Sequence, residues 1–108
     1  MSTEPALMTL KSVAQAIAQK KLSSREVTQS CLDRIARCEP RLNAFIAIEA
    51  DEALKAADAA DAALAKGKPG GALHGVPLAH KDMYYDAGHV VTCGSRIRRD
   101  FVPTTSRR

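Results

Sequence analysis

The stretch HGVPLAHKD, residues 74–82, decides how this chain is interpreted. Residues 76–81 are mostly apolar and predict a short β-strand that ends on a lysine. Because alternate residues of a strand share one face, Lys81 should lie on the same face as Ala79 and Pro77. These small neighbours would leave room for other groups to approach the lysine amine.

Turn-forming residues flank this expected strand on both sides. KGKPGGALHG, residues 66–75, precedes it and predicts a turn rich in glycine and proline. This turn lacks the Gly-Lys-Ser/Thr ending of a phosphate-binding loop. DMYYDAGHVVTCGS, residues 82–95, follows the strand and predicts a loop, a short extended piece at residues 89–92 and a turn at Gly94.

The first part of the chain predicts helices near residues 10–20 and 24–38. Thr9 can cap the first of these helices. Ser23 and Glu26, three residues apart, form a capping box in which hydroxyl and carboxylate satisfy backbone donors reciprocally. Pro40 is expected to end the second helix.

The pattern changes after Pro40. Residues 42–48 alternate with a period of two and are largely apolar on both faces, which predicts a strand buried on both sides. Residues 50–66 are rich in alanine and predict a third helix, which Gly67 should end. The expected fold class is therefore α/β.

The segment 74–95 closely resembles the amidase-signature family, in which a strand of the type HG-apolar-P-apolar-A-x-KD precedes a loop and a T-x-GS turn. In this chain the turn positions are Thr92, Gly94 and Ser95. The helical part is also similar to the N-terminal region of the family, so the resemblance covers roughly residues 8–103. It implies the N-terminal portion of an amidase-signature fold, with helices on a mixed sheet. The implied partial amidase domain spans residues 1–108, with a helical half at about 8–67, a lysine-bearing strand and loop at about 68–103, and a divergent tail at 104–108.

The resemblance implies that Lys81 is the lysine of a Ser–cis-Ser–Lys triad. A serine hydroxyl is a poor nucleophile until a base takes its proton, and a lysine can be that base only in its neutral form. The family carries both serines in a later segment rich in glycine and serine, and these 108 residues contain no such segment. Ser106 lies outside any glycine-rich context. We therefore expect an amidase-type hydrolase that is inactive as this chain alone.

For the other polar residues near Lys81, the sequence gives weaker support for a functional role. Asp82 could cap the following loop or pair with a cation. Tyr84 and Tyr85 could line a substrate pocket or pack against neighbouring residues. His74 is expected to be structural or to lie on the surface. No substrate-binding residue can be assigned from the sequence. His80 stands where most relatives are expected to be apolar.

Composition argues against nucleic-acid binding and against membrane association. The net charge of +4 comes largely from arginines between residues 96 and 108, where only Phe101 is aromatic, so nucleic-acid binding is not favoured. The start MSTEPALMTL lacks a basic region and a long apolar run, and no stretch reaches the roughly 18 apolar residues of a membrane span. We therefore expect a cytoplasmic protein with no membrane association.

Cysteine and histidine positions indicate no metal site, and no cofactor is expected. Cys31 and Cys38 would lie roughly 10 Å apart on a helix, which is too far for a disulfide. No Cys-x-x-Cys pair is present, and the three histidines match no zinc spacing.

Three functions stay open from the sequence. The first is an amidase acting on small carboxamides, or the related A subunit of aspartyl/glutamyl-tRNA amidotransferase, which has protein partners. The second is a non-catalytic remnant or fragment that only binds something, or that has no activity. The third is a small basic nucleic-acid binder, which a steep salt dependence would reveal. Whichever function applies, we expect the isolated chain to associate with itself.

Overall fold

Helices form the first part of the chain, and irregular turns form the second. In the computed structural model, which describes residues 4–106, the elements follow the order η1 (Pro5–Leu7), α1 (Leu10–Ala18), α2 (Ser24–Leu42), α3 (Ala50–Ala65) and η2 (Arg96–Arg98). The chain divides into two compact units, residues 1–77 and residues 78–108. The three expected helices are therefore confirmed.

The helix ends follow the expected capping chemistry. The Thr9 hydroxyl accepts from the Ser12 N–H at the start of α1, and the Ser23–Glu26 capping box begins α2. Gly67, with φ of 73°, lets α3 end in a turn where the Gly67 and Lys68 N–H groups donate to carbonyls of the last helical turn.

Pro40 does not end α2, contrary to expectation. The helix continues for two more residues and ends at Asn43, which has φ of 48° and donates its N–H to the Glu39 carbonyl. A proline this close to the end removes one backbone donor but leaves the final turn intact.

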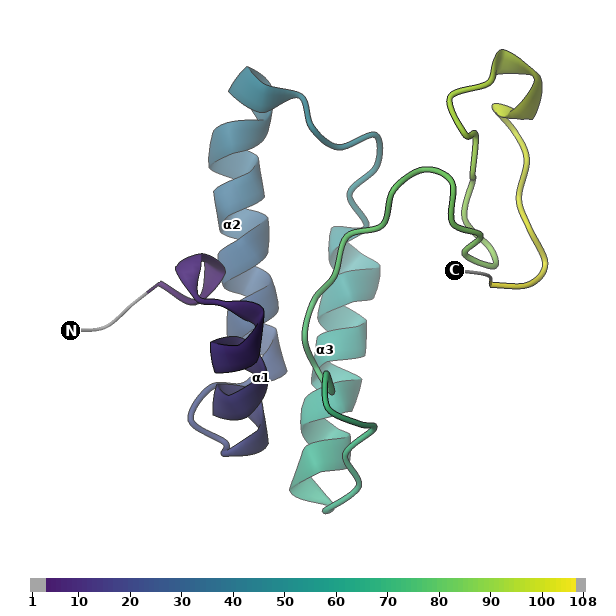
Figure 1. The fold of residues 1–108 in the computed structure, drawn as a ribbon. Coiled ribbons are helices and arrows are strands. Elements are labelled where there is room, and N and C mark those ends of the chain that lie inside the picture. Colours follow the sequence, from purple (N-terminus) through teal and green to yellow (C-terminus); the bar gives the residue numbers. More distant parts are fainter. Residues whose placement is uncertain (1–3, 107–108) are drawn as a thin grey trace. The chain divides into compact units, whose positions relative to one another are not determined.

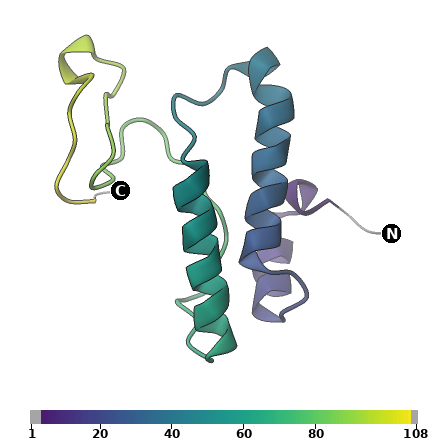
Figure 2. The ribbon, with the colours of Figure 1, turned by 180° about the vertical axis from the view of Figure 1, so that it is seen from behind.

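In the first unit, α2 and α3 lie side by side, and α1 packs against α2 (Figures 1 and 2). A small core forms where Val13 and Ile17 of α1 meet Val27 of α2, each at most 5% exposed. Leu64 of α3 and Val76 pack against this cluster. The core is thin, because much of α3 is alanine.

Buried Ser24 joins three segments of the first unit. Its hydroxyl donates to the Gly75 carbonyl at 2.5 Å, and its N–H donates to the Asp61 carboxylate of α3 at 2.7 Å. The Arg25 N–H donates to the other oxygen of Asp61 at 3.1 Å. Asp61 therefore satisfies two of the orphan donors that begin α2 and places negative charge at the positive end of the helix.

Gly75 allows this close approach. Its φ is 78°, and a Cβ added there would meet the Ser24 Cβ at 3.0 Å. His74 fixes the turn before it: its Nδ1 accepts from the Gly70 N–H, and its Nε2 therefore donates to the Ala60 carbonyl of α3, both at 2.8 Å. The structural role expected for His74 is therefore confirmed.

The expected strand at residues 42–48 is wrong. Leu42 is the last residue of α2, and residues 43–48 are irregular and exposed, with Ile46 at 80% exposure. The Ala44 and Phe45 N–H groups both donate to the Glu39 carboxylate, so they are not available to a neighbouring strand.

The expected strand at residues 76–81 is also wrong. It crosses the division between the two units, and Leu78 is 56% exposed. Lys81 lies in an irregular segment. The described residues contain no β-strand, so no neighbour provides the backbone pairs that a sheet requires. For residues 4–106 the α/β expectation is corrected to a helical unit followed by an irregular one.

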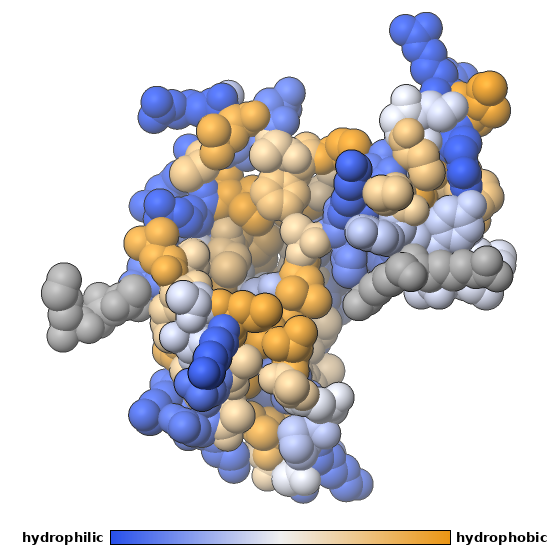
Figure 3. Space-filling model, in the orientation of Figure 1, coloured by the Kyte–Doolittle hydropathy of each residue, from blue (hydrophilic) through white to orange (hydrophobic). Residues whose placement is uncertain are grey.

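None of the helices in residues 4–106 has the length and apolar character that crossing a bilayer requires. Hydrophobic side chains gather between the helices of the first unit on the face shown in Figure 3, with hydrophilic ones toward its periphery.

Replacing Asp61 with alanine should lower the free energy of unfolding of the helical unit by about 1–2 kcal/mol, since two first-turn donors of α2 lose their acceptor. Urea denaturation followed by circular dichroism measures this change. The matched control is Asp58→Ala on the same helix, which breaks a half-exposed ion pair with Arg25 and should cost at most about 0.5 kcal/mol. Equal losses for the two variants would show that Asp61 does not cap α2.

Candidate active-site segment

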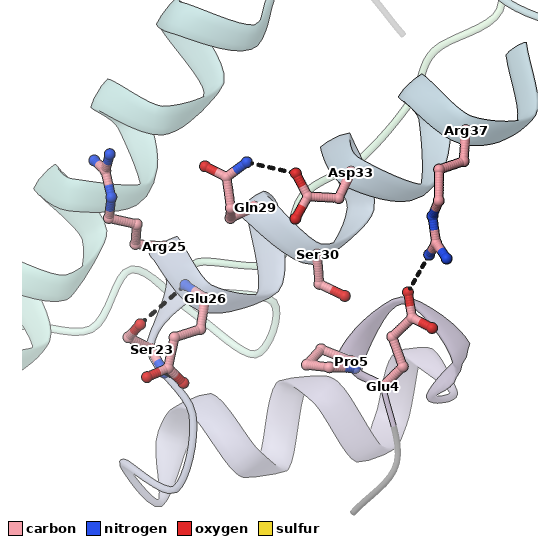
Figure 4. A pocket seen from close by; sticks show the side chains of 9 residues that line it. All are labelled: Glu4, Pro5, Ser23, Arg25, Glu26, Gln29, Ser30, Asp33 and Arg37. Carbon is pink, nitrogen blue, oxygen red and sulfur yellow. Dashed lines mark hydrogen bonds and ion pairs between the residues drawn. The ribbon is translucent and has the colours of Figure 1, made fainter.

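A broad groove in the first unit lies between η1 and the first part of α2 (Figure 4). Its volume is about 870 Å³. Glu4 of its wall pairs with Arg37 at 3.0 Å and with Arg34 at 3.3 Å. The residues that line it are Glu4, Pro5, Ser23, Arg25, Glu26, Gln29, Ser30, Asp33 and Arg37.

Groups in this groove are already used in structural contacts. The Ser23 hydroxyl caps α2, the Ser30 hydroxyl accepts from the Ala6 N–H at 3.1 Å, and Gln29 donates to Asp33 at 2.9 Å. No lysine or histidine lines the groove to act as a base. The groove therefore lacks the parts of a nucleophilic site.

Cys31 offers no catalytic nucleophile either. Cys31 packs against the small core, and burial, followed by the negative charge of Glu4, raises the pKa of its thiol. A thiol with a raised pKa is a poor nucleophile at neutral pH. Cys31, Cys38 and Cys93 are all free.

Lys81 lies in the second unit, at the start of a tight turn. Its carbonyl accepts from the Met83 N–H at 2.7 Å and from the Tyr84 N–H at 3.2 Å. The lysine is exposed, and no described residue forms an ion pair with it. The backbone at Lys81 is therefore held, while its amine is open to groups outside the described residues.

Asp82, directly after Lys81, binds the turn at residues 92–95. Its carboxylate accepts from the Thr92 N–H at 2.8 Å and from the Thr92 hydroxyl. These hydrogen bonds from Thr92, with further ones from Gly94 and Cys93, lower the pKa of Asp82. Of the two roles expected for Asp82, the described residues show the capping of the following loop, and the partner, Thr92, lies ten residues further along the chain.

The turn itself has the geometry that its sequence favours. Cys93 and Gly94 both have positive φ, 53° and 74°, as the central residues of a type I′ turn do. The Ser95 N–H closes the turn by donating to the Thr92 carbonyl at 2.9 Å. The turn expected at Gly94 is therefore confirmed.

Beyond this turn, the chain doubles back on itself. The Val91 N–H donates to the Phe101 carbonyl at 2.9 Å, and the Gly88 N–H donates to the Pro103 carbonyl at 3.1 Å. The Arg98 guanidinium lies 4.3 Å from the centre of the Phe101 ring. Arg98 also donates to the Tyr85 hydroxyl at 2.5 Å. Tyr85 therefore holds the returning chain in place.

The other polar residues near Lys81 form separate contacts in the described part of the chain, and these do not make a catalytic group. The ring of Tyr84 meets His80 edge-on with centroids 6.4 Å apart. The His89 Nδ1 lies 3.0 Å from an Asp86 carboxylate oxygen, while Cys93 is exposed in its turn. Sequence reasoning missed the stacking of Arg98 on Phe101, which a basic run followed by an aromatic residue could have signalled.

Comparison with known proteins gives a family match. A family model described as amidase matches residues 26–107, which include Lys81 and the turn at residues 92–95. The A subunit of glutamyl-tRNA(Gln) amidotransferase from Pelobacter propionicus is 46% identical over 99 residues, which are 92% of this chain and 20% of that protein. The corresponding A subunit from Hahella chejuensis is 46% identical over 95 residues, 88% of this chain and 19% of that protein.

A solved structure is also similar to this chain. It comes from work on a vestigial protein complex that reveals the evolutionary origins of an s-triazine catabolic enzyme. Its TM-score is 0.82 at 28% identity, with 92% of this chain and 22% of that chain covered. The present chain thus spans about a fifth of the length of the curated relatives it matches.

Acid should release the Asp82 carboxylate from Thr92. Because folding lowers the pKa of Asp82, its contribution to stability is fully present at neutral pH. That contribution begins to fade near the ordinary aspartate pKa of about 3.9 and is lost as the pH falls through the lower value of the folded state. The Thr92 amide shift, followed by NMR against pH, should therefore show a midpoint below about 3.9. Asp82→Asn should abolish this titration, whereas a midpoint at the ordinary value would contradict the lowered pKa.

Proposed function

Because the chain belongs to the amidase family, we propose that it forms part of a hydrolase of carbon–nitrogen amide bonds in which Lys81 is the catalytic base. The observation that carries this proposal is the segment HGVPLAHKD at residues 74–82, which lies within the family match over residues 26–107. The nucleophilic serine would come from residues outside these 108. The chain by itself would then be inactive.

The chemistry of the segment supports this role. Lys81 is exposed, so a serine-bearing segment could approach its amine and enclose it. Enclosure in a low dielectric and hydrogen bonds from serine hydroxyls favour the neutral amine that a base requires. Removing a proton from serine would then generate the nucleophile that attacks the amide carbonyl. Both serines of a Ser–cis-Ser–Lys triad would lie outside the present chain.

The relatives favour one branch of the family. Curated proteins that are 44–47% identical to this chain are amidotransferase A subunits. The complete protein would accordingly work with partner subunits and release ammonia from glutamine in the cytoplasm. A free-standing amidase for small carboxamides is the second candidate, and it rests on the family match over residues 26–107 alone.

We also propose that the isolated chain associates with itself. Apolar side chains that a complete domain would cover are open to solvent, including Leu42 at 69% and Ile46 at 80% exposure. Leu42 is the last residue of α2, and Ile46 lies in the irregular segment that follows it. Association would bury this surface.

Size-exclusion chromatography with light scattering tests the association of the isolated chain. The parent chain should elute as oligomers, and Leu42→Gln with Ile46→Gln should shift it toward monomer. The same substitution at Leu7, an exposed leucine outside this segment, should leave the distribution unchanged. A monodisperse parent monomer with a sharp thermal transition would contradict the proposal.

Lys81 can be tested in a chimera that joins this chain to the part of the Pelobacter propionicus protein that it does not match. Lys81→Ala should reduce kcat for ammonia release by about 10²- to 10⁴-fold, because general-base catalysis is lost. Lys81→Arg should lose as much, since a guanidinium keeps its proton. Lys68→Ala, at another exposed lysine, is the control. Near-parental kcat in a folded Lys81→Ala protein would end the assignment.

A further inference from the structure

Asp82 stands beside the proposed base, but its carboxylate is used elsewhere. Thr92 donates two hydrogen bonds to it, one from the backbone N–H at 2.8 Å and one from the hydroxyl. The Thr92 hydroxyl in turn accepts from the Gly94 N–H at 3.1 Å. The Asp82 carboxylate therefore binds the turn at residues 92–95, which the hydrogen bond from the Ser95 N–H to the Thr92 carbonyl already closes.

The hydrogen bonds between Asp82 and Thr92 restrain the backbone at Lys81. On one side, the Lys81 carbonyl accepts from the N–H groups of residues 83 and 84. On the other, the side chain of the next residue is tied to a turn ten residues away. A base must lie within hydrogen-bond reach of the proton it removes, so small displacements of its backbone reduce catalysis.

The same hydrogen bonds hold the negative charge of the Asp82 carboxylate away from the Lys81 amine. An aspartate adjacent in sequence is a near anion for the Lys81 ammonium, and an ion pair would stabilise the charged lysine, which cannot act as a base. Thr92 supplies two donors to this carboxylate, and no ion pair joins Asp82 to Lys81.

We propose that Asp82 is a positioning residue for Lys81: by clamping the turn at residues 92–95, it holds the lysine backbone in place and keeps its own charge off the lysine amine. The proposal rests on the proposed function, because it assigns Asp82 a part in the work of the same base. Asp82 itself touches neither substrate nor reacting atoms in this account.

The test uses the same chimera and measures kcat and KM for ammonia release. Asp82→Ala and Thr92→Val should each lower kcat by about 10- to 100-fold with KM within about twofold, because the base is displaced while substrate binding is kept. Thr92→Ser keeps the hydroxyl and should restore most of the loss. Asp100→Ala removes an aspartate of the same unit whose side chain is 92% exposed, and it should behave as the parent.

Parental kcat in folded Asp82→Ala and Thr92→Val proteins, while Lys81→Ala is inactive, would overturn the positioning role alone. Failure of Thr92→Ser to restore kcat would also overturn it. Should Asp82→Ala not fold, Thr92→Val decides, since it loses only the hydroxyl and keeps the backbone donor. An inactive but folded parent chimera, or a fully active Lys81→Ala, would instead refute the proposed function, and the positioning role would fall with it.

Discussion

The buried junction at Ser24 is the constraint on which the helical unit depends. Ser24, at the start of α2, is buried, and its N–H must find an acceptor because unpaired buried donors are costly. Asp61 supplies both oxygens, and the Ser24 hydroxyl reaches the Gly75 carbonyl. One serine therefore sets the packing of α2 on α3 and the place where the segment at residues 74–82 begins.

The family motif at residues 74–82 thus has two parts with different structural roles. Its first two residues, His74 and Gly75, bind to helices and shape the turn. Its last two, Lys81 and Asp82, belong to the second unit, where a clamp on Thr92 shapes the backbone. We infer that an amide-hydrolysing site needs both, since one part anchors the segment to the domain and the other presents the base.

The helices could be predicted because their signals are local. Thr9, the Ser23–Glu26 pair and Gly67 act within one turn of the helix ends that they define. The strand predictions failed, because a strand forms only beside a partner strand, and the sequence pattern does not identify that partner. At residues 42–48 the Glu39 carboxylate took the backbone donors that a partner strand would have used.

Long-range polar contacts were equally hidden from the sequence. Asp61 lies 37 residues from Ser24, and no spacing rule connects them. The proposal that Lys81 is the base comes from the family resemblance and not from composition, since an exposed lysine has no distinguishing sequence pattern of its own. The partner of Asp82 became visible only once the turn at Thr92 had been located in space.

The central claim is that this chain contributes the base of an amide-hydrolysing site whose nucleophile lies outside it. Its most direct test is complementation: the 108-residue chain is mixed with the separately produced remainder of the Pelobacter propionicus protein, and ammonia release from glutamine is followed. The account predicts no release from either part, release from the mixture, and none when the chain carries Lys81→Ala. Equal release from mixtures with and without Lys81, or release from the remainder alone, would contradict it.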